Sequence, residues 1–185
     1  LNTKYIVINP SSKAIRNTNA NGPAWFVQSI DLAKDANEEM TKLTNCNTKK
    51  KAIVHQEFKT LIAGLKADSN ASIRQTKYAT TELSYTSKSN TDQLAVFSEI
   101  YYPEGWNCYA DGKQLEPFRA DYLLRGAIIP AGTKTVVWKF EPQTFYTASK
   151  IALIGSILLL LSTAFILGKA LMGSLKKESN DELVD

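Results

Sequence analysis

The chain combines many short, alternating apolar segments with one continuous apolar run near its end. Residues 151–168, IALIGSILLLLSTAFILG, form 18 consecutive positions without a charge, and 13 of them are apolar. As a helix this run would be about 27 Å long, close to the roughly 30 Å hydrocarbon core of a bilayer. A soluble helix of this length needs a polar face, which the run lacks. We therefore predict a transmembrane helix over residues 150–171, which excludes a purely soluble protein.

Before this helix, residues 1–149 predict one domain of mainly β structure. From Ser72 onward, short runs rich in β-branched and aromatic residues are separated by turns at intervals of about ten residues. These runs are 72–80, 81–87, 93–102, 106–116, 122–129 and 134–140. Asp111-Gly112 is typical of a two-residue hairpin, and Pro130-Ala131-Gly132 marks a second turn. The pattern predicts an antiparallel β-sandwich-like domain.

The first part of the domain predicts further strands and one short helix. Strands are expected at residues 4–8, 24–32 and 52–58. The helix is expected between Asp35 and Asn45, with Asp35 accepting from the amide of Glu38 at capping-box spacing. Helical spacing directs three apolar side chains toward the core: Ala36, Met40 and Leu43. Residues 60–71 fit either a loop or a partial helix.

Charge and cysteine content exclude several classes of function. The 22 basic and 18 acidic residues are spread along the chain, too dilute for a nucleic-acid-binding patch. Cys46 and Cys108 are too few for a disulfide scaffold or metal site; they either form one disulfide or stay free. The single histidine, His55, has no second ligand at metal-binding spacing. We expect no catalytic residue, metal or cofactor in this chain, and no nucleic-acid partner.

Aromatic residues and arginines are the better candidates for function. Exposed aromatic rings can stack on the CH faces of sugars, whereas buried rings fill the core of a sandwich, and the sequence leaves both uses open. An arginine near Glu116 or Asp121 can pair with that carboxylate, or it can bind a phosphate or carboxylate of a ligand. The candidate glycan-contact residues are Trp106, Tyr109, Arg119 and Arg125.

Residues 97–142 resemble the C-terminal part of bacterial YfhO-like membrane proteins. The shared pattern is an aromatic-Pro-x-Gly-Trp segment, followed by Asp-Gly-Lys, Arg-Ala-x-Tyr, Pro-Ala-Gly, a final strand and a membrane helix. Residues 1–8 and 22–27 are similar to Bacteroidetes members of the family. The resemblance therefore spans nearly the whole chain.

The resemblance implies a part of a multi-spanning protein similar to glycosyltransferases that use lipid-linked sugars at the outer face of the membrane. In those proteins the catalytic acidic residue lies in an early extracytoplasmic loop, to which no residue here corresponds. The implied role is accessory: binding of a glycan or acceptor, or structural bracing of the membrane part. A membrane-anchored binding or adhesion module, or a structural subunit of an envelope complex, is the alternative.

Localisation and partners follow from the same features. The chain begins with Leu and shows no signal peptide, so we expect an export signal and further membrane spans upstream. Lysines flank both ends of the helix equally, but those of the short polar tail, residues 172–185, favour a cytoplasmic C-terminus. This tail is expected to be disordered. We predict a bacterial inner-membrane protein with an extracytoplasmic domain, whose partners are the bilayer, those upstream spans, and an envelope glycan or lipid-linked sugar.

Overall fold

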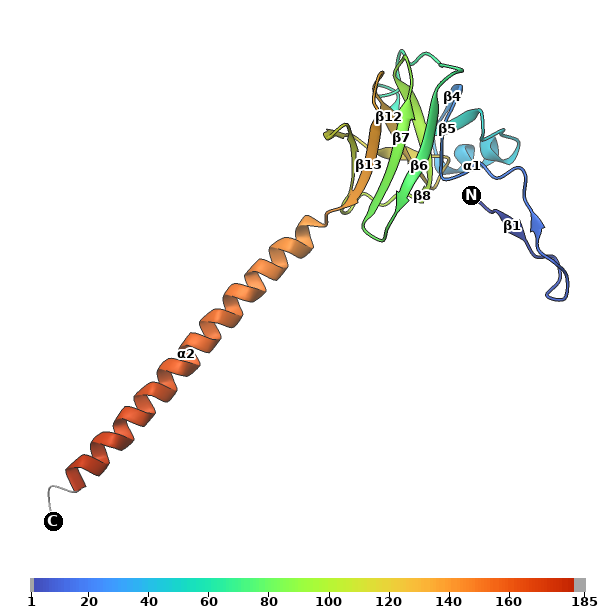
Figure 1. The fold of residues 1–185 in the computed structure, drawn as a ribbon. Coiled ribbons are helices and arrows are strands. Elements are labelled where there is room, and N and C mark those ends of the chain that lie inside the picture. The colour runs from blue at the N-terminus through green and yellow to red at the C-terminus, as the bar shows by residue number, and fades with distance from the viewer. Residues whose placement is uncertain (1, 182–185) are drawn as a thin grey trace. The chain divides into compact units, whose positions relative to one another are not determined.

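The computed structural model describes residues 2–181 of the chain, which divides into a β-rich unit ending at Glu141 and a helical unit beginning at Pro142. The β-rich unit contains a five-stranded sheet, a six-stranded sheet and a small two-stranded sheet (Figure 1). The expected mainly β fold with one short helix is confirmed. The small sheet pairs β1 (Tyr5–Ile6) with β2 (Ile15–Arg16).

The five-stranded sheet is antiparallel throughout and has the order β10-β9-β13-β7-β6. Its strands are β6 (Ser72–Tyr78), β7 (Glu82–Lys88), β9 (Trp106–Ala110), β10 (Lys113–Leu115) and β13 (Thr135–Phe140). Asp111 and Gly112 join β9 to β10 with φ values of 46° and 85°, as a type I′ turn requires. The predicted hairpin is therefore confirmed.

The six-stranded sheet has the order β3-β8-β12-β11-β5-β4. Its strands are β3 (Ala24–Phe26), β4 (Ser29–Ala33), β5 (Lys51–His55), β8 (Gln93–Ile100), β11 (Phe118–Ala120) and β12 (Leu124–Ile129). A short 3₁₀ helix, η1 (Gln56–Phe58), follows β5. One pair, β4 with β5, is parallel because helix α1 (Ala36–Thr44) connects the two strands, a crossover that differs from the expected antiparallel arrangement.

The strand predicted at residues 24–32 is in fact two strands. The amide of Val27 bonds to the carbonyl of Leu94 on β8, whereas the amide of Gln28 bonds to the carbonyl of Lys50, just before β5. The chain thus changes its pairing partner within two residues. As a result β3 and β4 form opposite edges of the same sheet.

The six-stranded sheet is buried on both faces. Residues 93–97 of β8 are all buried, and alternate side chains enter two different clusters. Ala95 and Phe97 pack against the five-stranded sheet, where the Phe97 ring lies 5.2 Å from that of Trp138. Leu94 and Val96 pack under a cover made by four side chains that follow β5: Phe58, Leu61, Ile62 and Leu65. Continuous apolar runs in the sequence therefore mark the central strands.

Helix α1 begins and ends where predicted, but its buried face is different. Asp35 is the N-cap and accepts from the amide of Glu38 at 2.9 Å, and Asn45 is the C-cap. The expected inward orientation of Ala36 and Met40 is wrong, because both are exposed and Leu43 is only half-buried. The buried side chain of α1 is that of Glu39.

The two cysteines are free thiols, Cys46 half-buried and Cys108 buried. The sequence leaves open one disulfide or two free thiols, and the structure shows two free thiols.

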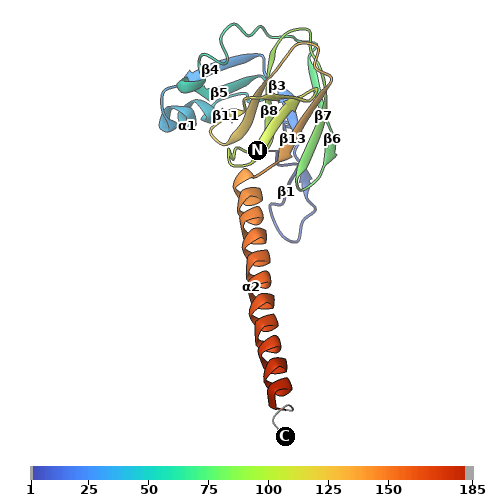
Figure 2. The ribbon, with the colours of Figure 1, turned by 90° about the vertical axis from the view of Figure 1, so that its left-hand side faces the viewer.

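Helix α2 (Gln143–Asp181) contains the predicted membrane span. Its segment Gln143–Ala170 is long and apolar enough to cross a bilayer, and no residue of its most apolar stretch is buried. The helix begins before Lys150 and continues through the first part of the predicted tail; residues 182–185 lie outside the described residues. Figure 2 shows α2 as one uninterrupted helix.

The type I′ turn predicts a local stability effect. In Gly112→Val, a β-branched residue must adopt positive φ, and we expect a loss of about 1–2 kcal/mol in the free energy of unfolding. No atom lies near the added Cβ position, so the loss isolates backbone strain. Gly112→Asn is the matched control and should lose less, because Asn tolerates this conformation. Equal stability of the Val variant and the parent, by chemical denaturation, would contradict the turn.

The division at Glu141 predicts that residues 1–141 fold without α2. A chain ending at Glu141 should be soluble and monodisperse, because its apolar clusters are buried within the β-rich unit. Size-exclusion chromatography and circular dichroism test this, with a mainly β spectrum expected. Aggregation of this chain in buffer, or a mainly helical spectrum, would show that the division is wrong.

Candidate functional site

Two of the four candidate glycan-contact residues pack together inside the domain. Arg125 is 5% exposed, and its guanidinium carbon lies 4.2 Å from the ring centroid of Trp106 and 5.2 Å from that of Trp138. Its Nε donates to the carbonyl of Ile100, and burial lowers the pKa of the guanidinium. The half-buried Trp106 also packs 5.4 Å from the ring of Phe140. These contacts are those of a structural stack.

Tyr109 lies on the opposite face of β9. The neighbouring Cys108 and Ala110 are buried, so strand alternation directs the Tyr109 side chain away from the core. Its hydroxyl donates to Glu141 at 2.6 Å, and Lys139 stands 5.6 Å from its ring centroid. The structure thus does not bring Tyr109 together with the Trp106 ring.

Arg119 is partly exposed and lies beside a pocket. It is paired in register with Arg125, but its side chain contacts Glu39 at 3.2 Å, and neither Glu116 nor Asp121 is its ion-pair partner. The Glu39 carboxylate is fully buried, while the Arg119 side chain remains about one-third exposed. No local pattern in the sequence indicates this pair, because the two residues are 80 positions apart.

An open pocket of about 590 Å³ surrounds Arg119, and we call it the Arg119 pocket. Its lining residues are Glu57, Phe58, Tyr101, Arg119, Tyr122 and Leu123. The guanidinium of Arg119 lies 5.6 Å from the ring centroid of Tyr122. The pKa of Tyr101 is raised, first by burial and then by the nearby charge of Glu57. The pocket therefore combines aromatic rings, one cation and one carboxylate.

Hydrogen bonds hold two residues at the wall of this pocket in a strained backbone conformation. Asp121 and Tyr122 have φ values of 49° and 66°, a conformation that costs on the order of 1–3 kcal/mol for each non-glycine residue. Asp121 exchanges two hydrogen bonds with Ile53, each 2.8 Å long. The amide of Tyr122 donates to Glu39 at 2.8 Å. The buried Glu39 thus holds both the Tyr122 backbone and the Arg119 side chain.

Asp121 is a buried carboxyl with one unused oxygen. Burial raises its pKa to about 6, and the charge of Glu39 adds to this, against the hydrogen bond from Ile53. Among the described residues, its Oδ2 atom has no hydrogen-bond partner. Asp121 is therefore protonated at a higher pH in the folded protein than in the unfolded chain.

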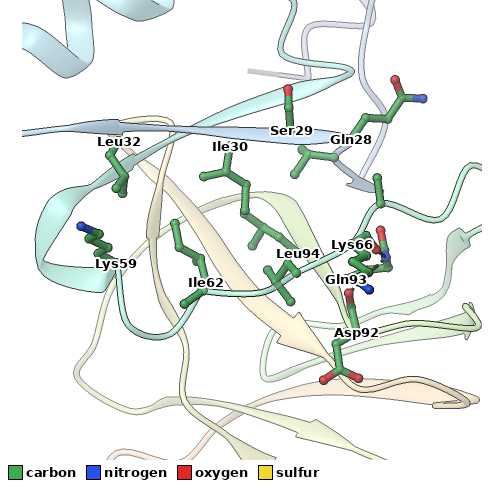
Figure 3. Close-up of a pocket in the computed structure, with 14 residues that line it drawn as sticks. Gln28, Ser29, Ile30, Leu32, Lys59, Ile62, Lys66, Asp92, Gln93 and Leu94 are labelled. Carbon is green, nitrogen blue, oxygen red and sulfur yellow. Dashed lines mark hydrogen bonds between the residues drawn. The ribbon is translucent and has the colours of Figure 1, made fainter.

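A second cavity, of about 330 Å³, lies between β4, β8 and the segment that follows η1 (Figure 3). Figure 3 shows Ile30, Ile62 and Leu94 directed toward one another, with Lys59 and Lys66 at the two sides. None of its described lining residues is aromatic. It suits an apolar group better than a sugar ring. Among the residues whose side chains the structure describes, no three His, Cys, Asp or Glu are close enough to hold a metal.

The raised pKa of Asp121 predicts a pH effect with a definite sign. The folded state binds this proton more tightly than the unfolded chain, whose carboxyl has the ordinary value of 3.8. This contribution to stability is lost as the pH rises toward 6. Relative to Asp121→Asn, the free energy of unfolding of the parent should fall by about 2 kcal/mol between about pH 4 and pH 7.

Denaturation of both full-length proteins in non-ionic detergent, across this pH range, measures the difference. Other carboxyls with lowered pKa, such as Glu82, change both proteins equally and cancel. Parallel profiles for the parent and the variant would contradict the burial of Asp121.

One family model matches most of the chain. The family model of the bacterial membrane protein YfhO matches residues 8–152, which include the Arg119 pocket and the start of α2. No curated protein and no solved structure matches the chain. The family match covers more than half of the sequence, and the chain therefore belongs to the YfhO family of bacterial membrane proteins.

Proposed function

We propose that this chain is an accessory, glycan- or acceptor-binding part of a multi-spanning membrane protein that transfers sugars from lipid-linked donors. In this proposal the β-rich unit lies outside the bacterial inner membrane and α2 is the last membrane helix. The observation that carries the proposal is the Arg119 pocket, where aromatic rings stand beside a guanidinium and a carboxylate.

The chemistry of the Arg119 pocket suits a sugar. The rings of Tyr101 and Tyr122 offer apolar faces to the CH groups of a pyranose, and their hydroxyls reach its polar edge. Arg119 presents several donors in one plane, which fits hydroxyls, a uronic acid or a phosphate. Since Glu39 already holds Arg119 and the Tyr122 backbone, binding needs little further ordering of these groups.

The same pocket supports an accessory role. Glycoside hydrolysis commonly uses two carboxyl groups about 5–10 Å apart that both reach the sugar, and a pocket without such a pair suits binding of a sugar better than its hydrolysis. The Arg119 pocket is lined by one carboxylate, that of Glu57, while Glu39 is buried and occupied by its two donors. The family resemblance likewise assigns catalysis to a part of the protein that these residues do not correspond to.

A bracing role is the second candidate, and α2 favours it. The most apolar stretch of the span is unburied in the structure, so lipid or other helices must cover it. The pairs Ala152 with Ser156 and Ala164 with Gly168 have the small-xxx-small spacing that permits close approach of a neighbouring helix. Bracing does not need an occupied Arg119 pocket.

Titration of the full chain in detergent with cell-envelope oligosaccharides separates the two roles. By calorimetry we expect dissociation constants of about 0.1–1 mM, or roughly 4–5.5 kcal/mol. Tyr122→Asn removes the ring but tolerates positive φ, and it should weaken binding about tenfold. Arg119→Lys should also weaken binding, because it loses the planar fork of donors.

The matched control is Tyr109→Asn, the same change at a tyrosine that does not line the Arg119 pocket. It should leave the affinity unchanged. Absence of binding by any envelope oligosaccharide would favour bracing. Loss of binding in Tyr109→Asn but not in Tyr122→Asn would place the site elsewhere.

A further inference from the structure

The first described residues form an exposed apolar hairpin, residues 2–23, which we call the N-terminal hairpin. Figure 1 shows it extending from the β sheets, with β1 on one arm. Five large apolar side chains in it are between 46% and 76% exposed: Tyr5, Ile6, Val7, Ile8 and Ile15. So much exposed apolar surface on so short a segment indicates a contact surface.

The exposed apolar residues lie on both faces of the hairpin. Tyr5 and Ile6 are neighbours on β1, so their side chains point to opposite sides, and they are 61% and 46% exposed. A protein surface packed against one face would leave the other apolar face in water. A bilayer interface, in contrast, surrounds an inserted hairpin on both faces.

The charge of the N-terminal hairpin has one sign. It contains Lys4, Lys13 and Arg16, and the first acidic residue of the chain is Asp31. Apolar residues flanked by cations, without acidic residues, are typical of segments that bind the surface of an anionic membrane. The chain also carries its own membrane span, so a bilayer is always close to the domain.

A polar hollow beside β1 and β2 has a cationic lining. Its volume is about 560 Å³, and its lining residues are Asn2, Lys4, Tyr5, Arg16, Asn17, Thr18, Ala20 and Gly22. Two of these are cations and none is acidic. Lys49 also reaches this region, donating to the carbonyl of Thr18. The hollow is large enough for a phosphate group together with its glycerol.

Local hydrogen bonds hold the N-terminal hairpin in this shape. At its tip, the amide of Ser12 donates to the carbonyl of Asn9 at 3.0 Å, and the amide of Ser11 donates to the Asn9 side chain. At its base, the amide of Gly22 donates to the Asn2 side chain. The apolar and cationic residues are therefore presented together before any partner binds.

We propose that the N-terminal hairpin is a second membrane contact, which lies in the interfacial layer of an anionic phospholipid bilayer and holds a headgroup phosphate between Lys4 and Arg16. The depth follows from the backbone. Only Tyr5–Ile6 and Ile15–Arg16 form a strand ladder, so backbone groups that are bonded neither in it nor at the tip and base need water, which excludes insertion into the hydrocarbon core. Tyrosine and cationic side chains suit the headgroup level. This proposal is independent of the Arg119 pocket.

Tryptophan quenching in bilayers tests the depth and the charge dependence. The full chain is placed in nanodiscs of phosphatidylcholine, with or without phosphatidylglycerol, that contain a headgroup-spin-labelled lipid. Ile8→Trp adds a fluorophore at a site that is 76% exposed, and Tyr78→Trp adds the matched control on edge strand β6, at a site that is 70% exposed. After subtraction of the parent signal, the fluorophore added by Ile8→Trp should be quenched and blue-shifted, more strongly with phosphatidylglycerol. The fluorophore added by Tyr78→Trp should stay unquenched.

Charge variants in the Ile8→Trp background test the phosphate site. Lys4→Gln with Arg16→Gln should abolish the extra quenching that phosphatidylglycerol produces. Lys88→Gln with Lys113→Gln removes the same charge from the exposed ends of β7 and β10. This control pair should leave the extra quenching unchanged. Circular dichroism confirms that each variant is folded.

Several results would overturn the proposal. Absence of quenching in the Ile8→Trp variant would exclude the bilayer, and a blue shift without quenching would point to a protein partner instead. Quenching that is equal in the two lipid mixtures, or equally reduced by both pairs of charge variants, would exclude a specific anionic site at Lys4 and Arg16.

Discussion

The two-residue connection between β3 and β4 is the constraint on which the shape of the domain depends. These strands form opposite edges of a six-stranded sheet, which in a flat sheet would lie about 24 Å apart. The path from Phe26 to Ser29 spans at most about 11 Å. The sheet must therefore curve until its two edges approach each other, and in Figure 2 β4 and β5 run across the direction of β8. One face of this sheet packs on the five-stranded sheet, and its other face packs on the second apolar cluster.

The same curvature brings together the groups that build the Arg119 pocket. Helix α1 connects the parallel strands β4 and β5, and β11 pairs with β5, so Glu39 on α1 can reach the bend between β11 and β12. A carboxylate buried there is costly unless it is paired and hydrogen-bonded. Arg119 and the Tyr122 amide satisfy it, and the two hydrogen bonds between Asp121 and Ile53 offset the strain of the bend. The pocket thus depends on contacts among distant segments.

The sequence predicts those elements that depend only on residues close together in the chain. The Asp111-Gly112 turn, the Asp35 cap and the apolar run of α2 each depend on residues a few positions apart, and the sequence predicts all three. The split of residues 24–32 into β3 and β4 depends on two different pairing partners, which no local pattern reveals. The burial of Glu39 in place of Met40 depends on Arg119, far along the chain. The buried face of α1 was therefore unpredictable from helical spacing alone.

The two arginines of the candidate set show why residue type does not determine role. Arg119 and Arg125 are register partners on β11 and β12. Arg125 is buried between the rings of Trp106 and Trp138, whose faces attract a cation without a carboxylate, so its charge is used within the core. Arg119 is fixed at one side by a buried carboxylate and leaves part of its guanidinium facing an open pocket. An arginine held in this way can still donate to a ligand, and this difference in surroundings places the binding hypothesis at Arg119 and away from Trp106.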